Sequence, residues 1–187
     1  MGTSDVRPLN DHEMARLPLA RAAMEDGGKS GTSTRFNFFA AFDGTNNHKD
    51  NLKLSGDPYP TNVGSLFKQA DSAASPAFQG KYYPGVGTGG DQGNIVNAGP
   101  NPTPAIDAAA EKAYAEFSDA ALKYLRIHPD ATPADLGASV VGFSRGCASA
   151  VRFSQLVNER GLTAPDGTVV AAPGSVPVTA TWRFRPM

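Results

Sequence analysis

Residues 142–146, with the sequence GFSRG, contain the residue types of a serine nucleophile. The pattern G-x-S-x-G matches the nucleophile elbow, a sharp turn between a strand and a helix that exposes a serine hydroxyl. Side chains two positions before and after the serine would collide in such a turn, so glycine suits Gly142 and Gly146. Ser144 would attack an ester carbonyl, and the N–H of Arg145 would stabilise the resulting oxyanion. The alternative is that Ser144 only caps the following helix.

A serine hydrolase also needs a general base, and in α/β-hydrolases the histidine follows the serine along the chain. The three histidines of this chain, His12, His48 and His128, all precede Ser144. Removal of triad members lowers the rate by several powers of ten, although oxyanion stabilisation and substrate binding persist. We therefore expect a hydrolase site that is catalytically incomplete in this chain. His48 is the candidate for a substitute base, and an exposed loop histidine is the simpler interpretation.

The second oxyanion donor is expected in the loop that follows an earlier strand. Residues 42–45 (FDGT) directly follow an aromatic-rich segment. Gly44 allows close backbone approach, so the N–H of Gly44 or that of Thr45 would face the oxyanion, and Asp43 would line the site. The alternative is an ordinary Asx turn at Asp43.

Alternating strands and helices are expected to position these residues. We expect strands at 35–42, 80–86 and 136–141, and helices at 63–70, 103–127 and 145–160. This alternation predicts an α/β fold, a parallel sheet with helices on both faces. Ligands of such sheets bind at the carboxyl ends of the strands, which is where Ser144 is expected. The first helix is expected to bury Val63, Leu66 and Phe67.

Composition and charge exclude several classes of partner and site. The chain has 187 residues, with 17 basic and 18 acidic side chains and a net charge of −1. This balance gives no electrostatic reason to expect nucleic acid or an anionic membrane as a partner. Cys147 is the only cysteine, which excludes an internal disulfide, and the scattered histidines show no metal-ligand spacing. We therefore expect neither a metal nor a cofactor.

Residues 85–90 match the dinucleotide-binding pattern G-x-G-x-x-G and follow an expected strand. A dinucleotide site needs a helix that begins at these glycines, because its N-terminus binds the pyrophosphate. An Asn- and Pro-rich segment follows instead, so a glycine-rich loop at the rim of the site is the better interpretation.

The ends of the chain suggest its organisation and location. No segment is long and apolar enough to span a bilayer, and residues 1–30 lack the apolar region of a Sec signal. We expect a cytoplasmic protein in the producing cell, exported, if at all, by a route without a cleaved signal. Residues 1–34 are expected to be a mobile polar leader, and residues 35–187 the N-terminal part of a hydrolase domain.

Three motifs occur in a fixed order: FDGTNN at 42–47, YYPGVGT at 82–88 and GFSRG at 142–146. Together they resemble the α/β-hydrolase catalytic domain of type VI secretion phospholipase effectors, over roughly residues 36–162. The resemblance implies a serine esterase that cleaves phospholipid esters and is injected into competing cells. It also implies a secretion-apparatus component and an immunity protein as partners. Carried over by position, Ser144 is the nucleophile, and Asp43, Gly44 and Thr45 line the site.

The chain departs from this family at two places. Cys147 stands where the family usually has alanine. In the family the next strand carries the catalytic acid and a histidine comes much later, whereas this chain ends with residues 181–187, about where that strand is expected to begin. The resemblance therefore implies a domain truncated at its C-terminal side. The alternative function is an inactive remnant or an interaction module that retains the hydrolase fold.

Overall fold

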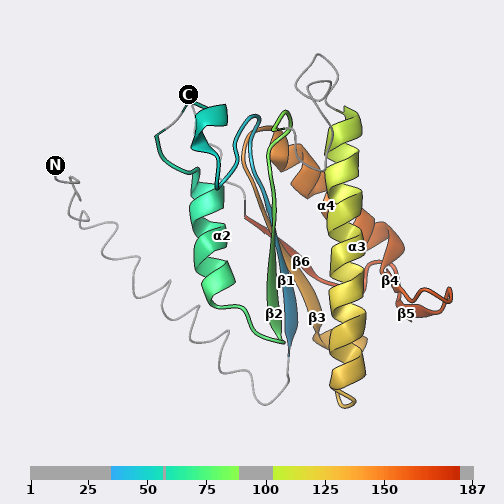
Figure 1. The fold of residues 1–187 in the computed structure, drawn as a ribbon. Helices are drawn as coiled ribbons and strands as arrows, with labels where there is room; N and C mark the ends of the chain where they lie inside the picture. Colours follow the sequence, from blue (N-terminus) through green and yellow to red (C-terminus); the bar gives the residue numbers. More distant parts are fainter. Residues whose placement is uncertain (1–34, 57, 89–102, 182–187) are drawn as a thin grey trace, which may run out of the picture. The chain divides into compact units, whose positions relative to one another are not determined.

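The computed structural model describes residues 35–56, 58–88 and 103–181. All of them belong to the unit Thr34–Met187, and the expected leader at 1–34 lies outside the described residues. The elements in chain order (Figure 1) are β1 (Phe36–Phe42), η1 (Leu52–Leu54), α2 (Asn62–Ser72), β2 (Phe78–Tyr83), α3 (Thr103–Ile127), η3 (Pro133–Asp135), β3 (Leu136–Gly142), α4 (Arg145–Arg160), β4 (Leu162–Thr163), β5 (Val169–Ala171) and β6 (Val178–Thr181).

The central sheet has the strand order β2-β1-β3-β6, and each neighbouring pair is parallel. Phe42, the last residue of β1, lies opposite Tyr83 at the end of β2 and Gly142 at the end of β3. The segments that leave these three strands therefore begin side by side at one edge of the sheet. The three sequence motifs meet at this edge.

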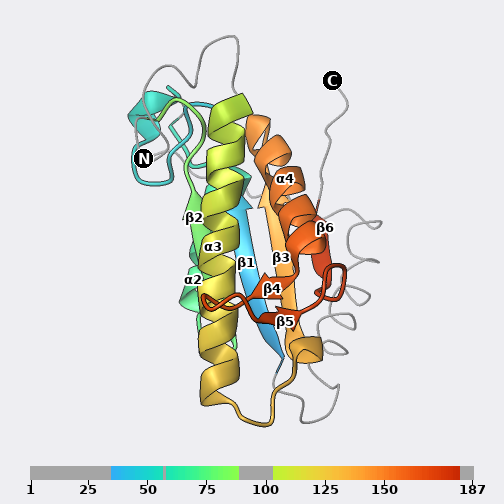
Figure 2. The same cartoon turned by 90° about the vertical axis from the view of Figure 1, so that its right-hand side faces the viewer.

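Helices cover both faces of the sheet, which confirms the expected α/β fold. In Figure 2, α3 and α4 lie side by side in front of the sheet, and α2 lies behind it. Phe36, Phe38 and Phe42 of β1 are buried in the cluster formed with α3 and α4. Phe39 and Ala41 point the other way and pack with Val63 and Phe67 of α2. Because both faces are covered, β1 is apolar on both sides.

The structure corrects three expectations. Strand β2 begins at Phe78 and ends at Tyr83, before Pro84, which has no N–H for the ladder. Leu66 of α2 is 42% exposed, because the helix turns only a narrow stripe toward the sheet. A fourth parallel strand, β6 (Val178–Thr181), pairs with β3 through Thr181, whereas the sequence predicts that the next strand only begins at about this residue.

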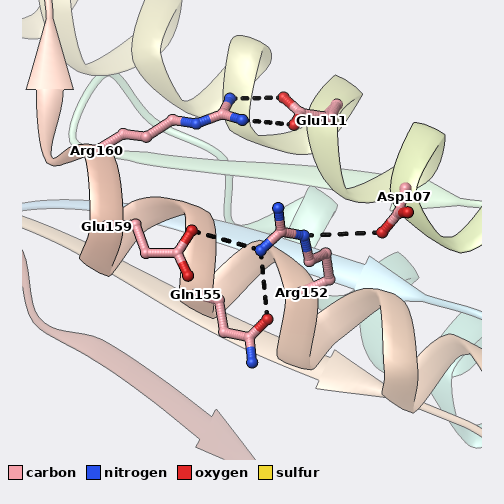
Figure 3. A network of polar contacts seen from close by, with 6 residues as sticks. All are labelled: Asp107, Glu111, Arg152, Gln155, Glu159 and Arg160. Carbon is pink, nitrogen blue, oxygen red and sulfur yellow. Dashed lines mark hydrogen bonds and ion pairs between the residues drawn. The ribbon is translucent and has the colours of Figure 1, made fainter.

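Charged side chains connect α3 to α4 on the solvent side (Figure 3). Both terminal nitrogens of Arg160 donate to the carboxylate of Glu111 at 2.7 Å, and the guanidinium lies 5.2 Å from the centre of the Tyr114 ring. Arg152 pairs with Asp107 at 3.7 Å and with Glu159 at 3.4 Å. The hydrogen bonds from Arg160 lower the pKa of Glu111, because they favour the charged carboxylate.

The substitution Arg160→Lys is expected to lower the free energy of unfolding by less than about 1 kcal/mol, because the pair is exposed. Lysine keeps the charge but loses the paired hydrogen bonds and the planar contact with the ring. Urea unfolding at low and high salt measures the difference in free energy of unfolding between wild type and Arg160→Lys. This difference should become smaller at high salt, because salt screens the charges of the pair. Glu111 has the lowered pKa, so its contribution is present above about pH 4.3 and is lost as the pH falls further. Arg126→Lys is the matched control, and a loss above about 2 kcal/mol would contradict a surface pair.

Candidate active site

Ser144 occupies the bend between β3 and α4 with a backbone conformation of φ 53° and ψ −125°. It is one of two non-glycine residues with positive φ among the described residues. Such a conformation costs on the order of 1–3 kcal/mol and typically persists at functional sites. The Ser144 side chain is exposed. The strand, the strained bend and the helix are therefore arranged as a nucleophile elbow requires.

The alternative in which Ser144 is an ordinary helix cap does not fit the structure. A capping serine has an extended backbone and accepts a hydrogen bond from an N–H of the first turn. Ser144 has a positive φ, and its hydroxyl makes no capping hydrogen bond. The Ser144 hydroxyl therefore does not cap α4.

The two glycines of the elbow are required by close backbone contacts. A Cβ atom on Gly142 would lie 2.7 Å from the carbonyl oxygen of Gly146. A Cβ on Gly146 would lie 2.4 Å from the carbonyl oxygens of both Phe42 and Asp43. These neighbours are backbone atoms that side-chain rotation cannot move aside. The first turn of α4 thus packs directly on the backbone at the end of β1.

The N–H of Arg145 is available beside the serine. It belongs to the first residue of α4, where N–H groups have no partner within the helix. The next two donors are satisfied locally, because Gly146 donates to the carbonyl of Phe143 and Cys147 to that of Ser144. Within the described ranges no atom accepts a hydrogen bond from the Arg145 N–H. It is the first expected oxyanion donor.

The loop after β1 lies against the elbow. A Cβ on Gly44 would lie 3.2 Å from Cβ of Ser144 and 2.5 Å from the Phe143 ring, so glycine permits this approach. The N–H of Gly44, however, donates to Oδ1 of Asp43 at 2.8 Å. The candidate donors in this loop are the N–H groups of Gly44 and Thr45. The N–H of Gly44 is therefore already engaged by Asp43.

The N–H of Thr45 is the better placed second donor. The carbonyl of Gly44 accepts a hydrogen bond from Asn47 at 2.9 Å and lies against Gly85, in the loop after β2. In a trans peptide the N–H points opposite to the carbonyl, so the Thr45 N–H points away from the β2 side. Thr45 directly follows Gly44, whose Cβ position lies 3.2 Å from Cβ of Ser144, so this N–H belongs to the loop that contacts the elbow. No described atom accepts a hydrogen bond from it.

Asp43 is close to these groups in the chain, but its side chain is buried, with 2% of its surface exposed. Its carboxylate accepts hydrogen bonds from the hydroxyls of Tyr82 at 2.6 Å and Thr61 at 2.8 Å, as well as from Gly44. These partners lie on the α2 side of the sheet. The carboxylate is therefore engaged with groups of the fold, whereas the sequence predicts that Asp43 lines the site beside Ser144.

Neither described histidine is bonded to Ser144. Nδ1 of His48 accepts a hydrogen bond from the N–H of Asp50 at 3.1 Å, and its ring meets Tyr82 edge-on. His128 stacks on Tyr124 with ring centres 4.2 Å apart, beyond the end of α3 and at the opposite edge of the sheet from the elbow. His12 lies outside the described residues.

Tyr83 is buried next to this region, with 2% exposed, and its hydroxyl donates to Glu116 of α3 at 2.6 Å. Burial, and then the hydrogen bond to Glu116, raise the pKa of Tyr83 well above its usual range. Burial, and then the hydrogen bond to Asp43, also raise the pKa of Tyr82. Both tyrosines are therefore held in the neutral form by the fold.

Alkaline unfolding is expected to report on Tyr83. Its folded-state pKa is raised, so its contribution is complete below the unfolded pKa of about 10 and is lost as the pH rises above that value. The free energy of unfolding should fall by about 1.4 kcal/mol per pH unit for this one proton. Tyr83→Phe should reduce the alkaline slope measured in urea titrations by this amount, while the contribution of Tyr82 remains. Tyr59→Phe, at a residue 77% exposed, is the control. Equal slopes in wild type and Tyr83→Phe would contradict the assignment.

Comparisons with known proteins give little beyond this geometry. No model of a known family matches the chain, and no curated protein matches it. A crystal structure of an uncharacterized protein from Pseudomonas aeruginosa is similar at 17% sequence identity and a TM-score of 0.42. The similarity covers 92% of this chain and 32% of that one, so the chain spans about a third of the length of that protein. No helix among the described residues is both long and apolar enough to cross a membrane.

Proposed function

We propose that this chain is the nucleophile-bearing part of a serine ester hydrolase. The observation that carries the proposal is the strained, exposed Ser144 at the β3–α4 bend, with no capping role and with two unengaged N–H groups beside it. Its oxygen attacks the acyl carbonyl as its proton passes to a base, and the carbonyl oxygen becomes an oxyanion that accepts hydrogen bonds from Arg145 and Thr45. Collapse expels the alcohol, and water then releases the acid from the acylated serine.

We place the general base outside the described residues, because His48 and His128 are engaged elsewhere. Oxyanion stabilisation and binding alone leave on the order of 10³-fold catalysis over water in triad enzymes that lack a member. A measurable but slow esterase is therefore the expected property where only the serine and the two amides of the described residues act.

The substrate class that we propose is a phospholipid ester. The half-exposed ring of Phe143, adjacent to the nucleophile, offers an apolar contact for an acyl chain. The order of the three motifs supports a role as a type VI secretion effector with an immunity protein as partner. This role rests on the sequence resemblance.

A fluorophosphonate ester, which reacts with activated serines, tests the proposal. Incubation with wild type followed by peptide mass spectrometry should locate the adduct on Ser144, and Ser144→Ala should remain unlabelled. Ser154→Ala is the matched control, because it removes a hydroxyl of α4 that bonds the Ala150 carbonyl. Labelling that persists in Ser144→Ala, or a folded wild type that is never labelled, would overturn the assignment.

The second candidate is an interaction module without catalysis. It is favoured by the absence of a histidine contact to Ser144 among the described residues. This candidate predicts a folded protein that neither reacts with the fluorophosphonate nor hydrolyses p-nitrophenyl butyrate or phosphatidylglycerol vesicles. Hydrolysis that disappears in Ser144→Ala would exclude it.

A further inference from the structure

The carboxylate of Asp43 is buried, and no described cation pairs with it. Burial of an ionised carboxylate is costly unless hydrogen bonds replace its water. Here three donors do so, from Gly44, Thr61 and Tyr82. The fold thus retains a polar side chain, with all three hydrogen bonds accepted by its oxygens, at a buried position that an apolar side chain could fill.

The three donors join separate parts of the structure to the loop after β1. Thr61 is the N-cap of α2, where its hydroxyl oxygen also accepts the N–H of Gly64 at 3.0 Å. Tyr82 belongs to β2, and its hydroxyl oxygen also accepts the N–H of Lys49 at 2.9 Å. The loop from Asp43 to Lys49 is therefore connected to Tyr82 at both of its ends.

We propose that Asp43 is a positioning residue of the oxyanion site, an inference that rests on the proposed hydrolase function. By accepting the Gly44 N–H, its carboxylate helps to fix the orientation of the chain at the start of the loop. The next peptide then keeps its carbonyl against Gly85, and the Thr45 N–H, which has no described acceptor, is held on the opposite side of that peptide. Asp43 acts through this loop and does not itself touch the substrate.

The hydrogen-bond pattern explains why a carboxylate is needed. Oδ2 of Asp43 accepts from two hydroxyls, those of Thr61 and Tyr82. An asparagine would either place its NH₂ group, which cannot accept, against these hydroxyls or turn that group toward the N–H of Gly44. In both orientations at least one donor loses its acceptor, so the isosteric substitution should disturb the loop.

The test measures kcat and KM for p-nitrophenyl butyrate, and the rate of Ser144 labelling, in the full chain. Loss of one oxyanion donor typically lowers kcat by about 10²-fold or more, and we expect about this loss in Asp43→Asn with KM changed by less than about twofold. Thr61→Val should lower kcat by roughly tenfold, whereas Thr61→Ser, which keeps the hydroxyl, should restore it. A purely structural role would instead reduce the folded fraction and leave kcat per folded molecule unchanged.

The outcomes separate this inference from the proposed function. A wild type that is folded but not labelled overturns both. A wild type that is labelled, together with an Asp43→Asn variant of unchanged kcat, overturns the positioning role alone. If Asp43→Asn does not fold, the Thr61→Val and Thr61→Ser pair decides, and equal kcat values in that pair overturn the inference.

Discussion

Replacing Ser144 with glycine is expected to raise the free energy of unfolding by about 1 kcal/mol while it abolishes labelling and ester hydrolysis. The serine has φ 53° and ψ −125°, a conformation that a Cβ atom disfavours and that glycine adopts freely. Glycine also loses more entropy on folding, which reduces the gain. Loss of a serine nucleophile lowers the rate by more than about 10³-fold in complete hydrolases.

Two further variants separate the effect of backbone strain on stability from the loss of the nucleophile. Ser144→Ala keeps the Cβ atom and should be no more than about 0.5 kcal/mol from wild type in stability, although it is equally inactive. Asn46→Gly is the matched control, since Asn46 also has positive φ, at 60°, but asparagine tolerates that region well. Asn46→Gly should raise the free energy of unfolding by less than Ser144→Gly does. A Ser144→Gly variant less stable than Ser144→Ala in urea unfolding would show that the bend is not strained.

Gly85→Ala is expected to lower the free energy of unfolding by more than about 3 kcal/mol, with loss of activity in any folded remainder. A Cβ on Gly85 would lie 1.5 Å from the carbonyl oxygen of Gly44 and 2.4 Å from its carbonyl carbon. Both atoms belong to the backbone, so the loops after β1 and β2 must separate to make room. Their separation would move the Gly44–Thr45 peptide, which lies in the loop that contacts the elbow.

Gly137→Ala is the control for this effect. Gly137 belongs to β3 of the central sheet, and a Cβ there would meet no atom closer than 3.7 Å. Thermal unfolding and fluorophosphonate labelling of the two variants should therefore differ sharply. A Gly85→Ala protein within about 1 kcal/mol of wild type would contradict the close approach of the two loops.

The sequence predicted the elements that carry the elbow because their signals are local. The apolar runs at β1 and β3 and the glycines around Ser144 are sufficient to place a bend between a strand and a helix. The sequence does not decide whether Ser144 caps that helix, since serine suits both roles. Its backbone angles and hydrogen bonds in the structure decide this. The choice between Gly44 and Thr45 likewise depends on which N–H is already engaged.

The environment of Asp43 could not be predicted in this way. Its hydroxyl partners, Thr61 and Tyr82, lie 18 and 39 residues further along the chain, and nothing in their local sequence marks them as its donors. Gly85 was similarly ambiguous, because it matched part of a dinucleotide-binding pattern. The structure gives it a steric reason instead, its contact with the Gly44 carbonyl.

The register of β1 has a consequence for the variation that this fold tolerates. Phe42 packs with Tyr83 on one face of the sheet, while Asp43, the next residue, points to Thr61 on the other. Deleting one residue within β1 would exchange these two directions, placing a carboxylate among aromatic rings and an aromatic ring among hydroxyls. Changes in chain length should therefore accumulate outside β1, and natural variants should keep the number of residues between Phe36 and Asp43 constant.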